Sequence, residues 1–182
     1  MLALIAIWAF AEGIVFFIIA DVPITALGIK AGWRKALTGA AIASAFAASG
    51  GAIVWLWASS SPKDVIALML AVPAIGEDLI EYAYEDWRAN GPIGMMMGSF
   101  SGVPYKLYAL AAGTVGGQNP QGLALFVIAS MLARFPRFAL VAVLSGLIGP
   151  WLKERIGARA VWTAFALGWV AIYAWYWSTT GF

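Results

Sequence analysis

The segment from residue 121 to 149 reads QGLALFVIASMLARFPRFALVAVLSGLIG. Its apolar length exceeds the roughly 20 residues that a helix needs to cross a bilayer. Two arginines, Arg134 and Arg137, stand in its middle on either side of Pro136. The alternation of apolar and polar residues that marks a transmembrane barrel strand is missing from it. The segment therefore predicts a membrane-spanning helix that carries charge at depth.

The composition of the whole chain agrees with this prediction. Of its 182 residues, 63% are hydrophobic and 11% are charged, whereas soluble domains are about half apolar and a quarter charged. We expect one all-α integral membrane domain over residues 1–182. The sequence has no cysteine and no histidine, which excludes disulfides, thiolate metal sites and imidazole bases. The net charge of +2 is too small to indicate nucleic acid. We expect no metal and no cofactor.

Four further segments are apolar. Residues 36–58, rich in Ala, Gly and Ser, and residues 160–178, dense in Trp and Tyr, are predicted to span the membrane with aromatic interfacial anchors. Residues 2–29 are interrupted by Glu12, Asp21 and Pro23. Residues 92–117 contain many glycines and Pro104, so they would make a poor continuous helix.

The loops differ in charge, and this predicts the topology. Basic residues cluster in loops 30–35 and 153–159, whereas residues 59–91 hold six acids against two bases. The positive-inside rule places both basic loops in the cytoplasm, in a multi-pass arrangement. An odd number of crossings must then lie between residues 92 and 149. We therefore expect residues 92–117 to form a re-entrant hairpin beside a cavity, while residues 2–29 either span or re-enter.

A weak internal symmetry accompanies these segments. The tripeptide Ile-Ala-Ser at 42–44 follows the first interrupted segment, and it recurs at 128–130 after the second. Two halves that each combine a broken segment with a full span would fit an inverted-repeat transporter. The glycine-rich faces of residues 36–58 suit helix packing within one chain or between two, which allows a homo-oligomer.

Five ionisable residues lie inside the apolar segments: Glu12, Asp21, Lys106, Arg134 and Arg137. Each costs about 2.5–3.5 kcal/mol at a helix centre, so all five are candidates for function. Structural alternatives exist for each. Asp21 can cap a helix N-terminus, Lys106 can extend its ammonium to an interface, and the arginines can simply pair with the two acids.

Arg134 and Arg137 are three residues apart and therefore share one helix face beside the proline. Paired guanidinium groups match phosphate oxygens well. Three bases against two acids leave one positive charge, which suits a substrate that bears phosphate. Glu12 and Asp21 could then alternate between pairing with arginine and taking up a proton.

Several stretches resemble one known family. They are Glu12 through Asp21, the block FSGVPYK at 100–106 that contains Pro104, Tyr105 and Lys106, the AAG at 111–113, and residues 130–138 with the two arginines. Together they resemble the DedA superfamily with its VTT (SNARE-associated) domain, and within it the small YqaA-type members, over a core of about residues 8–150. Such members carry several prolines just before the acid, where this chain has Phe17, Ile19 and Ala20.

The resemblance implies two re-entrant hairpins in a bacterial inner (plasma) membrane. It also implies a lipid transporter or flippase, for undecaprenyl phosphate or a phospholipid, linked to the proton gradient. It also implies that Glu12 and Asp21 are the embedded acids and that Arg134 and Arg137 are the essential arginines. The expected partners are membrane lipids with an anionic phosphate headgroup. The alternatives are a proton-coupled exporter of small ions or drugs, an assembly protein of membrane biogenesis, and an enzyme acting on lipids through Ser or Asp, which the lack of His and Cys disfavours.

Overall fold

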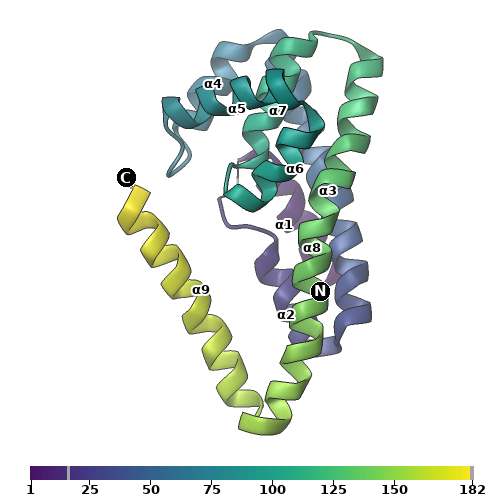
Figure 1. Cartoon of the computed structure of the whole chain (residues 1–182), viewed down its shortest axis with the longest axis vertical. Helices are drawn as coiled ribbons and strands as arrows, with labels where there is room; N and C mark the ends of the chain where they lie inside the picture. The colour runs from purple at the N-terminus through teal and green to yellow at the C-terminus, as the bar shows by residue number, and fades with distance from the viewer. Residues whose placement is uncertain (16, 181–182) are drawn as a thin grey trace.

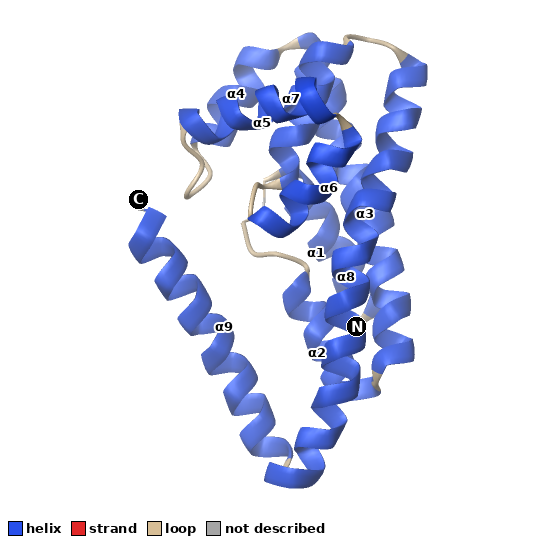
Figure 2. Cartoon of the chain, in the orientation of Figure 1, coloured by secondary structure: helices blue, strands red, loops and turns tan. Residues whose placement is uncertain are grey.

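The computed structural model describes residues 1–15 and 17–180 of the chain. All regular structure in this part is helical, and Figure 2 shows helices joined by short loops. In chain order the helices are α1 (Leu2–Ile14), α2 (Asp21–Ala31), α3 (Trp33–Ser60), α4 (Pro62–Leu70), α5 (Glu77–Asn90), α6 (Pro92–Ser101), α7 (Tyr105–Gly116), α8 (Pro120–Ile156) and α9 (Ala158–Thr180). The predicted all-α class is therefore confirmed.

Helices α3 and α8 form the centre of the molecule, packed against each other along their length (Figure 1). Both are long and apolar enough to cross a membrane. They contain the predicted spans 36–58 and 121–149 and extend beyond both. Helix α8 continues through Pro136 without a break, although proline removes one backbone hydrogen bond from a helix. The predicted terminal span, 160–178, lies within the single helix α9.

The two interrupted segments are helical hairpins. The connection between α1 and α2 includes a turn at residues 17–20, and α6 and α7 are joined by a turn at residues 102–104. Gly102 ends α6 with φ of 95°, a left-handed conformation that glycine adopts without a Cβ penalty. Pro104 then precedes the first residue of α7, where its fixed φ suits the start of a helix. Both segments are thus broken helices, as their sequences predict.

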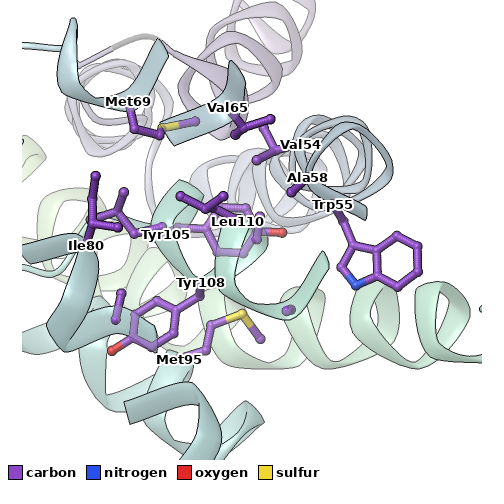
Figure 3. Close-up of a cluster of buried hydrophobic side chains, with 14 of the residues drawn as sticks. Val54, Trp55, Ala58, Val65, Met69, Ile80, Met95, Tyr105, Tyr108 and Leu110 are labelled. Carbon is purple, nitrogen blue, oxygen red and sulfur yellow. The ribbon is translucent and has the colours of Figure 1, made fainter. Parts of the chain in front are cut away.

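The hairpins approach the centre from opposite ends of the molecule (Figure 1). Helix α1 packs along α3, α2 packs along α8, and α7 packs against α3. Glycines permit the contact of α1 with α3: a Cβ on Gly13 would lie 2.6 Å from the Ala47 carbonyl oxygen. Large side chains around α7 build one core (Figure 3). Alanines of α3 build the other, against α1 and α2.

The antiparallel packing of α3 and α8 brings the two basic loops together. The loop before α3, with residues 30–35, and the loop after α8, with residues 153–159, lie at the lower end in Figure 1. The acidic helix α5 lies at the opposite end. The charge separation predicted from the sequence is therefore present in the fold.

Candidate functional site

A cavity of about 230 Å³ lies where the two hairpin turns meet the middle of α8 and the last turns of α9. Four charged side chains line it, and most of its other lining residues are aromatic or aliphatic. The charged lining residues are Glu12, Lys106, Arg134 and Arg137. Pro104 and Tyr105, which the sequence also singled out, line it too. Asp21 is not part of the lining but lies next to it, behind Arg137.

Arg134 and Glu12 form the more deeply buried of two ion pairs. Nη2 of Arg134 donates to Oε1 of Glu12 at 2.7 Å, and only 7% and 10% of their side-chain surfaces are exposed. The guanidinium carbon lies 4.5 Å from the ring centre of Tyr105 and 4.9 Å from that of Phe138. Contacts with the faces of two rings stabilise a desolvated cation. Arg134 is therefore fixed in position by three partners.

Arg137 forms the second pair and joins three elements. Its Nη2 donates to Oδ2 of Asp21 at 2.8 Å, and its Nη1 donates to the Ser99 carbonyl at 2.6 Å. Asp21 is the first residue of α2, Ser99 lies in the last turn of α6, and Arg137 is on α8. The Arg137 side chain keeps 29% of its surface exposed, against 4% for Asp21. Of the two arginines, Arg137 is the more accessible from the cavity.

Asp21 lies at the start of α2 but does not cap it. Helix α2 has no side-chain hydrogen bond at its N-cap, which is Ala20. The carboxylate of Asp21 instead pairs with Arg137, as the structural alternative for the arginines expects. Position in the first turn still lets the acid interact favourably with the helix dipole.

Glu12 has a second role in the turn that follows α1. Its Oε2 accepts a hydrogen bond from the Ala20 amide at 3.2 Å, while Oε1 accepts from Arg134. The indole of Trp8 donates to the Ile18 carbonyl at 2.9 Å. Backbone groups that a broken helix leaves open need such partners away from water. One carboxylate therefore connects the ion pair with the shape of the turn.

Lys106 is buried, with 4% of its surface exposed, and faces the cavity from the first turn of α7. Its side chain does not extend to the outer surface, so the interfacial interpretation of this lysine is wrong. The structure thus brings Glu12, Pro104, Tyr105, Lys106, Arg134 and Arg137 together around one space.

The chain matches no family model, and no curated protein or solved structure is detectably similar to it. The relation to the DedA superfamily therefore stays a prediction. Within the described residues, no group of three or more His, Cys, Asp or Glu side chains is placed to hold a metal ion.

Two contributions to the site carried no usable signal in the sequence. Ser99 contributes its backbone carbonyl, which any residue could supply. The aromatic residues of α9 are predicted from the sequence to be interfacial anchors, yet several of them close one side of the cavity: Trp169, Tyr173, Trp175 and Tyr176. Sequence density of Trp and Tyr does not distinguish a wall from an anchor.

Proposed function

We propose that this chain is a bacterial inner-membrane protein that moves lipids with a phosphate-bearing headgroup across the bilayer. The observation that carries the proposal is the cavity. Three basic side chains and one acid, from helices α1, α7 and α8, line it. A lipid headgroup needs polar contacts, and its chains need apolar walls. The cavity offers both next to each other.

The charge of the site favours an anion. The two acids and three bases around the cavity carry one net positive charge. Arg137 presents a partly exposed guanidinium, which can bind phosphate oxygens through paired donors. Helix α7 begins beside the cavity at Tyr105, and the N-terminus of a helix also attracts anions.

Membrane topology follows from helix length and charge. At about 1.5 Å per residue, α6 and α7 reach roughly 15 and 18 Å, too short for a hydrocarbon core of about 30 Å. Helices α1 and α2 are similarly short. We therefore propose that α3, α8 and α9 span and that both hairpins re-enter, with basic loops 30–35 and 153–159 in the cytoplasm. Each hairpin precedes a long helix and approaches from the opposite end, which is the pattern of an inverted repeat.

The ion pairs suggest how transport can be linked to the proton-motive force. Each arginine near the cavity pairs with one acid, Arg134 with Glu12 and Arg137 with Asp21. A proton taken up by either acid removes its negative charge and leaves the arginine to a phosphate. Departure of the lipid would restore the pair and release the proton. On the resemblance to the DedA superfamily, these acids and arginines correspond to that family's functional groups.

A flipping assay tests the proposal. Purified protein in liposomes should accelerate the transbilayer movement of fluorescently labelled phosphatidylglycerol, but not of labelled glucosylceramide, whose headgroup is uncharged. The double variant Asp21→Asn/Arg137→Gln removes a cation from the cavity without leaving a lone buried charge. It should lose at least tenfold in flipping rate. Arg159→Gln, which removes an exposed charge far from the cavity, should flip normally.

Two results would oppose the proposal. Equal flipping of the charged and the uncharged lipid would remove the headgroup from the mechanism. Full flipping by the Asp21→Asn/Arg137→Gln variant would show that Arg137 does not bind the headgroup.

A further inference from the structure

The turn between α1 and α2 is fixed from two sides. On one side, Oε2 of Glu12 accepts the hydrogen bond of the Ala20 amide at 3.2 Å. On the other, the Tyr173 hydroxyl on α9 accepts that of the Ile19 amide at 2.9 Å. These are consecutive peptide groups. A displacement of the turn that breaks one of these hydrogen bonds therefore strains the other.

Aromatic contacts accompany the hydroxyl of Tyr173. The ring of Phe17, in the turn, lies 5.5 Å from that of Trp177 between centres. Trp177 in turn lies 6.0 Å from Tyr173 on the same helix. These contacts attach the C-terminal part of α9 to the turn, and in Figure 1 this part is remote from the junction with α8.

Most of α9 makes little contact with the rest of the chain. Leu167, Val170 and Trp175 are 63%, 65% and 68% exposed. Helix α9 diverges from α8 after the short connection at Gly157 (Figure 1). It nevertheless closes one side of the cavity with aromatic and aliphatic side chains. Helix α9 is therefore a wall of the site that few contacts hold in place.

We propose that α9 is a lateral gate through which the lipid enters the cavity, and that Tyr173 is the positioning residue that holds this gate against the turn. The inference rests on the proposed lipid transport. In the closed state, α9 is joined to the turn by the hydrogen bond between Tyr173 and the Ile19 amide and by the ring contact between Trp177 and Phe17. In the open state, the headgroup passes between α9 and the turn, and the chains stay against the apolar side chains of α9.

Glu12 couples the opening of the gate to the binding of the lipid, because the same carboxylate contacts Arg134 and the turn. In the proposed coupling, a proton on Glu12 ends its ion pair with Arg134 and leaves this arginine to the phosphate. A neutral carboxyl group holds the Ala20 amide less strongly than a carboxylate does. The turn then loosens on the side of Glu12, and the neighbouring Ile19 amide shifts relative to Tyr173. Occupation of the site and release of α9 are thereby coupled.

The first test measures opening without measuring transport. The chain has no cysteine, so Val103→Cys places a single thiol in the cavity lining. Adding Tyr173→Phe removes the hydroxyl and keeps the ring. We expect a lipid-soluble maleimide to label this thiol about fivefold faster, the factor that loss of one hydrogen bond of ordinary net strength produces. The melting temperature should stay unchanged within a few degrees.

The matched control is Tyr82→Phe in the same Val103→Cys background, because Tyr82 is half exposed on α5 and away from the cavity. It should leave the labelling rate unchanged. Equal labelling rates with Tyr173 and with Phe at this position would overturn the gate, whatever the flipping assay shows.

The second test locks the gate. In a Phe17→Cys/Trp177→Cys variant, a short bifunctional methanethiosulfonate reagent should join the turn to α9 and reduce phosphatidylglycerol flipping at least tenfold. A reductant should restore it, and each single-cysteine variant should be insensitive to the reagent. Unimpaired flipping by the cross-linked protein would overturn entry at this place. If the unmodified protein flips no lipid at all, the proposed function fails, while the labelling test still decides whether Tyr173 holds α9.

Discussion

Glu12 and Arg134 form an ion pair that is 90% or more buried at the side-chain level. Such a pair has a modest net value, but removing one partner leaves an uncompensated charge and costs about 3–5 kcal/mol. We therefore expect Glu12→Gln and Arg134→Met each to lower the free energy of unfolding by that amount. In the double variant the loss should fall short of the sum of the two by about 1–3 kcal/mol. Denaturant titration of the detergent-solubilised protein measures all three values.

The exposed Glu81 provides the control, because Glu81→Gln should change the unfolding free energy by no more than about 0.5 kcal/mol. Strictly additive costs of Glu12→Gln and Arg134→Met would mean that the two side chains do not interact in the folded protein. The double variant should also be inactive in flipping, since it lacks one of the cations that line the cavity.

For single residues, the sequence identifies the charged groups but not their partners. The energetic cost of burying charge is enough to single out Glu12, Asp21, Lys106, Arg134 and Arg137 from their positions in apolar segments. Each acid then meets an arginine more than 100 residues away along the chain. Local spacing gives no information about such pairs. The capping alternative for Asp21 was reasonable for the same reason, since it needs only neighbours in sequence.

The packing of α3 against α7 places Tyr105 beneath Arg134. Gly51 on α3 leaves room for the phenol ring: a Cβ there would contact the Tyr105 hydroxyl and lie 2.6 Å from Cζ. Gly51→Ala should displace the ring and destabilise the protein by about 1–3 kcal/mol, the usual cost of overpacking. Because the ring contacts the guanidinium of Arg134, flipping should fall as well. Thermal unfolding and the flipping assay measure these two effects.

Gly168→Ala is the matched control, because a Cβ at this position of α9 meets no atom within 4 Å. Alanine favours a helix over glycine by up to about 1 kcal/mol, so this variant should be as stable as the parent or more so. Similar losses at Gly51 and Gly168 would show that the effect is one of the backbone and not of space for Tyr105.

Element boundaries were less predictable than element types. In residues 2–29 the charges and Pro23 suggest where a helix stops, yet α1 contains Glu12, and α2 begins at Asp21. The turn lies between them, in a run of apolar residues, because side chains from α1 and α9 bind its backbone groups. A partner such as Tyr173, 154 residues away, leaves no trace in the local sequence. Proline does not reliably mark a helix boundary either. Pro104 immediately precedes α7, whereas α8 continues through Pro136.

At the scale of the whole molecule, the charges of the loops were more informative about the arrangement of the helices than the hydrophobicity of the segments. Counting crossings between the basic loops required an odd number between residues 92 and 149. The glycines and Pro104 then assigned the non-crossing segment to residues 92–117, where the fold contains two short helices. It also places both basic loops at one end. The position of α9 could not be predicted in this way, because the length and composition of a helix do not determine where around the bundle it lies.

The proposed topology predicts which loops share a side of the membrane. Single cysteines can replace Ala31, Ala89, Gln118 and Ala158, all of which are uncharged and lie in the loops or at helix ends. A membrane-impermeant thiol reagent added to intact cells with a permeable outer membrane should label positions 89 and 118. Positions 31 and 158 should react only in inverted vesicles, because the positive-inside rule keeps their basic neighbours in the cytoplasm.

Positions 89 and 118 flank α6 and α7, so they distinguish the two topologies directly. Two helices that together reach in and return must leave both flanks on one side, whereas a crossing must separate them. Their combined length of about 33 Å would suffice for a single crossing if α6 and α7 were one straight helix. The turn at residues 102–104 folds α7 back toward the end from which α6 came. Labelling of 89 and 118 from opposite sides would therefore contradict both the re-entrant hairpin and the proposed inverted repeat.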